Sequence, residues 1–126
     1  MGSERKAGVA YPEELRKFVE EAGDNLLVVD VRNPNAEVEP GDQKSISLTG
    51  LPSEDYRPKS VHIVFDRAAN SMPLPEVPKD TPIITHCGAG ARGQLAKEFL
   101  IAHGFNNVIN GGGPKEKECW EIYGSQ

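Results

Sequence analysis

Residues 82–92 read PIITHCGAGAR, and this stretch decides the fold. Cys87 follows an apolar run and begins a glycine-rich loop, and an amphipathic pattern predicts that a helix begins near Arg92. The N-terminus of a helix carries a partial positive charge and N–H groups without helical partners, and both stabilise a nearby anion. Such surroundings favour the ionised thiolate, so Cys87 is predicted to be a nucleophile at neutral pH.

Hydrophobic patterning divides the rest of the chain into alternating helices and strands. Helices are expected at 12–22, 93–103 and 115–123, and strands at 26–31, 61–65, 81–86 and 107–110. Residues 33–59 and 72–80 are rich in turn-forming residues. We expect the first to be a long loop, with a short turn of helix within it as the alternative, and the second to be a connector. This alternation predicts an α/β fold with a parallel sheet, in which Asp30 and Cys87 both lie at the carboxyl edge.

Composition indicates one compact domain over residues 1–126, with a flexible N-terminus at 1–8. The chain has 126 residues, a net charge of −5, and no apolar run near the about 20 residues that span a membrane. The negative charge argues against nucleic acid as a partner. Two cysteines and no signal peptide predict reduced thiols in the cytoplasm, with an organelle as the alternative if a targeting segment has been removed.

The residues around Cys87 predict an anion-binding loop, although a buried cysteine is also a common core residue. Gly88 and Gly90 let the backbone curve and point several N–H groups at one spot. Arg92 either stabilises an anion in this loop or caps the outer face of the helix. His86 is expected to be a neutral packed residue at the base of the loop, with tuning of the thiol as the alternative.

Three segments in the correct order resemble the rhodanese family. They are LVVDVR at 27–32, HCGAGAR at 86–92, and FNNVINGG at 105–112 followed by Trp120. The resemblance covers nearly the whole chain and implies a single rhodanese domain with a three-layer α/β/α fold around a mainly parallel sheet.

The resemblance also implies sulfur transfer through a persulfide on Cys87. The donor would be thiosulfate or mercaptopyruvate, and the acceptor cyanide, a thiol or a protein partner. The backbone amides of the active loop would solvate the charge of the persulfide; they belong to Gly88, Ala89, Gly90, Ala91 and Arg92. Asp30, Arg32 and His86 would support the loop, although Asp30 is also suited to an ordinary turn at a strand end.

Two other classes of function remain open on the sequence. Cysteine phosphatases and arsenate reductases of this fold carry five residues between the cysteine and the arginine, whereas four separate Cys87 from Arg92. A shorter loop suits one sulfur atom better than a tetrahedral oxyanion. The segment at 55–63 departs from the rhodanese pattern, and the stretch from Gly112 to Trp120 is longer than usual. These departures keep a non-catalytic binding or regulatory module, or a sulfur carrier, as a third hypothesis.

The remaining polar and sulfur-containing residues predict no further site. Cys119 is expected to be a packing residue, with a resolving thiol for Cys87 as the alternative. His62, His103 and the cysteines lack the spacing of metal ligands, so neither a metal nor a cofactor is predicted. The three glycines at 111–113 are expected to form a turn rather than a phosphate loop.

Overall fold

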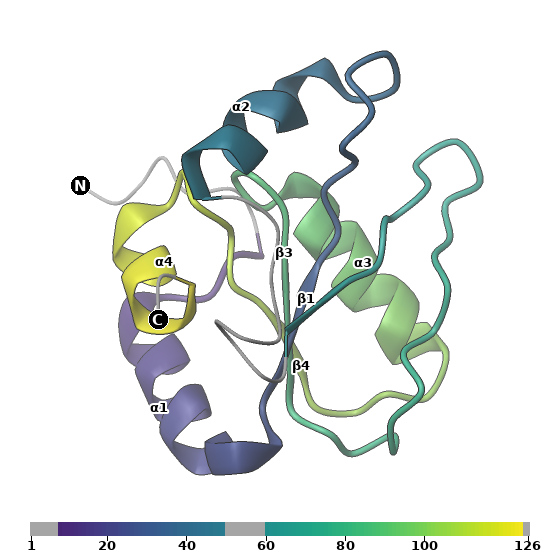
Figure 1. Cartoon of the computed structure of the whole chain (residues 1–126). Coiled ribbons are helices and arrows are strands. Elements are labelled where there is room, and N and C mark those ends of the chain that lie inside the picture. Colours follow the sequence, from purple (N-terminus) through teal and green to yellow (C-terminus); the bar gives the residue numbers. More distant parts are fainter. Residues whose placement is uncertain (1–7, 50–59, 125–126) are drawn as a thin grey trace.

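The computed structural model describes residues 8–49 and 60–124. Along the chain these residues form α1 (Pro12–Ala22), the short 3-10 helix η2 (Gly23–Asn25), β1 (Leu27–Asp30), α2 (Pro40–Thr49), β2 (Ser60–His62), β3 (Ile83–His86), α3 (Ala91–Ala102), β4 (Val108–Asn110) and α4 (Lys117–Tyr123). Figure 1 shows how these elements surround the central strands.

The four strands form one sheet in the order β2-β1-β3-β4, and every neighbouring pair is parallel. In the register of the sheet, Val28 pairs with Ser60 on one side and with Ile84 on the other, and Ile84 pairs in turn with Ile109. All residues of β1 and β3 are buried, as expected for parallel strands that are covered on both faces. The carboxyl ends of β1 and β3 therefore lie side by side.

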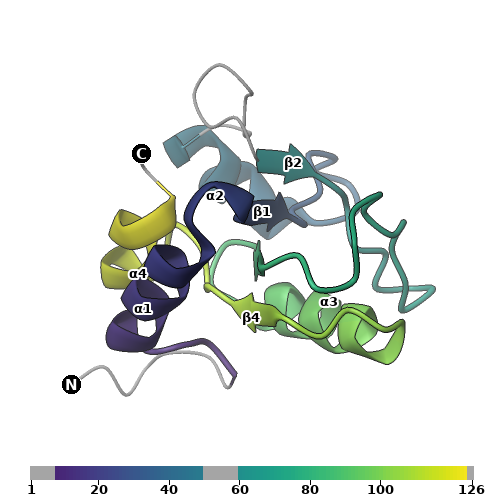
Figure 2. The same ribbon diagram turned by 90° about the horizontal axis from the view of Figure 1, so that it is seen from below.

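Helices cover both faces of this sheet. Figure 2 shows α1 and α4 on one side and α3 on the other, which confirms the predicted three-layer α/β/α architecture. Alternate residues of each strand face opposite layers, so two clusters of buried side chains form. The cluster beneath α3 includes Val29, Ile83, Cys87 and Leu100. The cluster beneath α1 and α4 includes Leu15, Val28, Ile84, Cys119 and Tyr123.

The expectation of a long loop over residues 33–59 is wrong in part, because the ten-residue helix α2 lies within this segment. The helix lies above the carboxyl edge of the sheet (Figure 1). The residues that α2 buries include the polar side chains of Asp42 and Ser45. An apolar pattern was therefore a poor guide to this helix. Residues 50–59 of the expected loop lie outside the described part of the chain, as does the expected flexible N-terminus apart from Gly8.

Several predicted boundaries also move by a few residues. Thr81 is held in a turn by a hydrogen bond from its N–H group to the carbonyl of Pro78, so β3 starts only at Ile83. Strand β2 ends at His62 because its neighbour β1 ends at Asp30. The N–H group of Lys115 donates to a loop carbonyl, so α4 begins at Lys117 and not at 115. Helix α3 begins at Ala91, two residues before the predicted start, and α1 has the predicted bounds.

Within residues 8–49 and 60–124, every helix is too short or too polar to cross a lipid bilayer.

Candidate active site

Cys87 lies directly after β3, and α3 already starts at Ala91, so residues 88–90 alone separate the cysteine from the helix. The N–H group of Gly90 donates a hydrogen bond to the Sγ atom of Cys87 over 3.1 Å. Gly90 adopts a φ of 123°, a backbone conformation that side chains rarely permit. Cys87 is 2% exposed, so its sulfur meets the backbone of its own loop and little solvent.

The loop after β4 holds this active loop in place. The N–H group of Cys87 donates to the carbonyl of Gly112 over 3.0 Å, and the N–H group of Lys115 donates to the carbonyl of Gly88 over 2.9 Å. A methyl group at position 113, where φ is 142°, would overlap the carbonyl oxygen of Cys87. The glycines at 111–113 therefore do more than form the predicted turn, because they let two backbones approach closely. Three consecutive glycines were the signal for this contact in the sequence.

Asn110 is a second support that the sequence analysis missed. Its side chain is fully buried at the end of β4. The Nδ2 atom donates to the carbonyl of Gly90 over 2.9 Å, and the Oδ1 atom accepts from the N–H group of Gly112 over 3.0 Å. One amide side chain thus ties both loops together and fixes the glycine that donates to Cys87. The available signal was a polar side chain directly after the apolar pair Val108 and Ile109.

Asp30 and Arg32 form a buried ion pair at the end of β1. The Nε atom of Arg32 donates to Oδ1 of Asp30 over 2.9 Å, and Nη2 donates to Oδ2 over 2.6 Å. Burial opposes ionisation of Asp30, but the electrostatic interaction with His86 on the neighbouring strand and the contacts with Arg32 outweigh it and lower the pKa of Asp30. The pair is thereby held in its charged form.

Arg32 connects this pair to α2 and, through α2, to the active loop. Its Nη1 atom donates to the carbonyl oxygen of Ser45 over 2.7 Å. A methyl group at position 88 would lie 2.5 Å from the Oγ atom of Ser45, so this serine packs directly against Gly88. Asp30 and Arg32 are therefore connected to the active loop through Ser45. That they support the loop stays a prediction.

Arg92 points toward α2 and is buried. Its Nη2 atom contacts Oδ1 of Asp42, and its Nε atom lies 4.0 Å from Oε1 of Glu39. Burial alone would lower the pKa of Arg92, but the hydrogen bond to Asp42 and then the negative charge at Cys87 raise it. The outer face of the helix, one of the two predicted positions for this side chain, is thus not where it lies. Asp42 and Glu39 were not among the predicted site residues, because they fall in the segment that was expected to be a loop.

His86 occupies a packed position at the base of the loop. The residue is 1% exposed, and the centre of its ring lies 5.0 Å from that of Trp120 and 5.7 Å from that of Tyr123. The Nδ1 atom lies 3.3 Å from the carbonyl oxygen of Cys87. This contact is to the backbone of the cysteine, and the ring faces α4.

The second cysteine lies in the other half of the core. Cys119 is buried in the cluster beneath α1 and α4, and its Sγ atom donates to the carbonyl of Ala10 over 3.5 Å. Cys87 belongs to the cluster on the opposite face of the sheet. This is the packing position predicted for Cys119.

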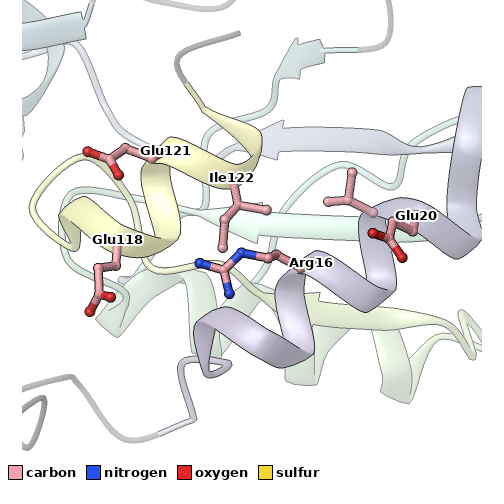
Figure 3. Close-up of a pocket in the computed structure, with 6 residues that line it drawn as sticks. Arg16, Glu20, Glu118, Glu121 and Ile122 are labelled. Carbon is pink, nitrogen blue, oxygen red and sulfur yellow. The ribbon is translucent and has the colours of Figure 1, made fainter.

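A groove between α1 and α4 does not contain the site. It has a volume of about 360 Å³, and Figure 3 shows its charged rim. The lining residues are Arg16, Val19, Glu20, Glu118, Glu121 and Ile122. In the described part of the chain, no group of three or more histidine, cysteine or acidic side chains could hold a metal ion. The absence of a metal or cofactor from the chemistry stays a prediction.

Comparison with known proteins identifies the family. The sequence profile described as Rhodanese-like domain matches residues 11–113. The chain belongs to the rhodanese-like family. The resemblance drawn from the DVR strand, the cysteine loop and the closing glycine segment is thereby confirmed.

Two solved structures from Saccharomyces cerevisiae share this rhodanese-like fold. An uncharacterised protein is 19% identical with a TM-score of 0.54, and the alignment covers 94% of this chain and 95% of that one. The single-domain sulfurtransferase RDL2 is 25% identical with a TM-score of 0.52, covering 95% of this chain and 94% of that one. Among curated proteins, the sequence search found no match.

Proposed function

We propose that the chain is a sulfurtransferase, one rhodanese domain over residues 1–126, that carries sulfane sulfur as a persulfide on Cys87. The observation that carries the proposal is the 3.1 Å hydrogen bond from the N–H group of Gly90 to Sγ of Cys87, at the N-terminus of α3. Membership of the rhodanese-like family and the likeness to a single-domain sulfurtransferase support activity of this general type. Thiosulfate as donor and cyanide as acceptor are the finer parts of the proposal.

In the loading step, the thiolate of Cys87 attacks the outer sulfur of thiosulfate. A sulfur–sulfur bond forms to Cys87 while the bond within the donor breaks, and sulfite leaves with the electron pair. The persulfide keeps one negative charge, as the thiolate did, and sulfite keeps the two charges of thiosulfate. The amides of residues 88–92 and the positive end of α3 stabilise the sulfur anion, because the first N–H groups of a helix have no partner within it.

In the unloading step, a nucleophilic acceptor attacks the terminal sulfur of the persulfide. Cyanide leaves as thiocyanate, and a thiol, small or on a partner protein, leaves as its own persulfide. In each case the electron pair returns to Sγ of Cys87 and restores the thiolate. Each step moves a neutral sulfur atom together with its six valence electrons from one nucleophile to another, so no outside oxidant or reductant takes part and the proposed chemistry calls for no redox cofactor. We place this activity in the cytoplasm, on small-molecule donors and acceptors or a protein acceptor.

The test is intact-mass spectrometry of the protein after incubation with thiosulfate, beside a Cys87→Ser control. We expect the wild-type protein to gain the mass of one sulfur atom and to lose it when cyanide is added, and the control to gain nothing. A mercaptopyruvate arm tests the alternative donor. If neither donor adds sulfur to the wild type, the proposal is wrong, and phosphatase and arsenate-reductase assays and a search for protein partners become the next experiments.

A further inference from the structure

The cation next to the active cysteine is already paired with a carboxylate. The side chain of Arg92 is 8% exposed, and its Nη2 atom contacts Oδ1 of Asp42, whose side chain is 4% exposed. The other oxygen of Asp42, Oδ2, accepts a hydrogen bond over 2.8 Å from the N–H group of Asn33. Both oxygens of the carboxylate are thus held, and its negative charge is fixed against Arg92.

One nitrogen of the guanidinium stays available. The Nη1 atom of Arg92 is buried and has no hydrogen-bond partner among the residues that the structure describes. Leaving such a donor unsatisfied is costly, so this atom is suited to an oxygen of a bound substrate. Arg92 is the second residue of α3 and so follows the active loop directly. Its partner Asp42 lies in α2, and Ser45 of the same helix packs against Gly88, so the guanidinium lies beside the active loop.

The other charges near this pair are more exposed to solvent. Glu39 lies 4.0 Å from Arg92, but it also faces Arg67, 3.5 Å away and 52% exposed. The exposed Lys115 runs beside Gly88, since a methyl group there would lie 3.8 Å from its Cε atom. Solvent and salt screen exposed charges strongly and buried ones weakly. The net charge that acts on a donor bound next to Cys87 is therefore set mainly by Arg92 and Asp42.

We propose that Asp42 determines which sulfur donors the site accepts, by neutralising Arg92 and so favouring singly charged or neutral donors over doubly charged thiosulfate. The proposal rests on the sulfurtransferase function and adds a specificity-determining residue to it. The Nη1 atom of Arg92 can bind one oxygen of a sulfonyl group on either kind of donor. The carboxylate of Asp42 repels a second negative charge, and this repulsion is large where water is scarce.

The experiment compares two donors that transfer the same kind of sulfur but differ in charge. Thiosulfate carries two negative charges and releases sulfite, whereas benzenethiosulfonate carries one and releases benzenesulfinate with the electron pair. Rate constants for persulfide formation on Cys87 are measured by rapid quench and intact-mass spectrometry for the wild type and for Asp42→Asn. We expect the ratio of the thiosulfate rate to the benzenethiosulfonate rate to rise about tenfold in the variant. The amide has nearly the shape of the carboxylate, so charge is the main change.

A matched control removes one negative charge elsewhere. Glu118 lines the groove between α1 and α4 (Figure 3), and Glu118→Gln changes the net charge of the protein by the same amount as Asp42→Asn. We expect its donor ratio to stay within about twofold of the wild type. A rise equal to that of Asp42→Asn would trace the effect to net charge and overturn the proposal.

Further outcomes separate this proposal from the function on which it rests. If Asp42→Asn slows both donors equally, Asp42 only positions Arg92, and its role in specificity is disproved. If Asp42→Asn fails to fold, Glu39→Gln is used in its place. The ratio of its thiosulfate rate to its benzenethiosulfonate rate must then exceed that of the wild type, by a smaller factor than expected for Asp42→Asn. If the wild type forms the persulfide but the ratio of the two donor rates is the same in the variants, the proposal about Asp42 is wrong and the sulfurtransferase function stands. No persulfide with either donor defeats the proposed function.

Discussion

The carboxylate of Asp30 and the guanidinium of Arg32 pair at the end of β1, where the exposed fractions of the two side chains are 0% and 1%. Arg32 also donates to the carbonyl of Ser45 in α2. Removing one member of a buried ion pair costs more than the pair contributes, because the remaining charge is left in a poor solvent. Substitution of Asp30 therefore measures how much this ion pair contributes to stability at the carboxyl edge of the sheet.

Asp30→Asn is expected to lower the free energy of unfolding by about 3–5 kcal/mol, because the charge of Arg32 loses its partner. Urea denaturation at neutral pH measures this change. The control is Asp80→Asn at an exposed position, which should change the free energy of unfolding by less than about 0.5 kcal/mol. A loss below about 1 kcal/mol in Asp30→Asn would show that solvent or another group compensates Arg32.

The same carboxylate predicts the direction of a pH dependence. The pKa of Asp30 is lowered in the folded protein from 3.8, so the unfolded chain binds its proton first as the pH falls. The stabilising contribution is complete well above 3.8 and is lost as the pH falls through the lowered pKa of the folded state. In urea titrations between pH 7 and about pH 2, the gap between wild type and Asp30→Asn should narrow toward acid. A constant gap would contradict the lowered pKa.

Among the elements, those with strong local signals were predictable from the sequence. Helix α1 has its predicted bounds because Pro12 suits the first turn and Gly23 ends the helix with a φ of 55°. Strand β3, which ends directly before Cys87, and its neighbour β1 were predicted because both lie in apolar runs. The apolar run did not fix the start of β3, because the turn at Thr81 depends on a hydrogen bond to the carbonyl of Pro78.

Helix α2 and the partners of Arg92 could not be predicted in this way. The segment carries Pro34 and Pro40 and lacks an apolar stripe, because its buried side chains include those of Asp42 and Ser45. Its position depends on contacts that are remote in sequence, such as that between Arg92 and Asp42. Cys87 and its loop were predictable as a site from local sequence, whereas the charge environment of the loop required the tertiary structure.

The loop after β4 offers a test of how one element positions another. In Gly113→Ala the new methyl group would overlap the carbonyl oxygen of Cys87, and the φ of 142° is strained for alanine. We expect persulfide formation to slow at least about tenfold, because the active loop must shift. Rapid-quench mass spectrometry measures the rate.

The matched control is Gly41→Ala in α2, where an added methyl group meets no atom within 4 Å. Alanine is the better helix former, so this variant should gain up to about 1 kcal/mol in free energy of unfolding and keep its rate of persulfide formation. If Gly113→Ala loads sulfur as fast as Gly41→Ala does, the contact between the two loops does not position Cys87.

At the scale of the whole molecule, the sheet separates the two cysteines. Cys87 packs in the cluster beneath α3, and Cys119 packs in the cluster beneath α1 and α4. A resolving thiol must reach the sulfur of the persulfide, and a disulfide needs the two Cα atoms within about 7 Å. A sheet with helices on both faces keeps side chains of opposite layers apart, so the chemistry at Cys87 should not involve Cys119.

Cys119→Ala is accordingly expected to leave the rate of persulfide formation within about twofold of the wild type while lowering stability by about 1–2 kcal/mol, the cost of a small cavity in the core. Thermal melting and rapid-quench mass spectrometry measure the two effects on one sample. Cys87→Ser should show the reverse, with no persulfide and little change in melting. A Cys119→Ala protein that loads sulfur at the normal rate but cannot pass it to a thiol acceptor would instead make Cys119 a participant in transfer. That result would require the two layers to open during turnover.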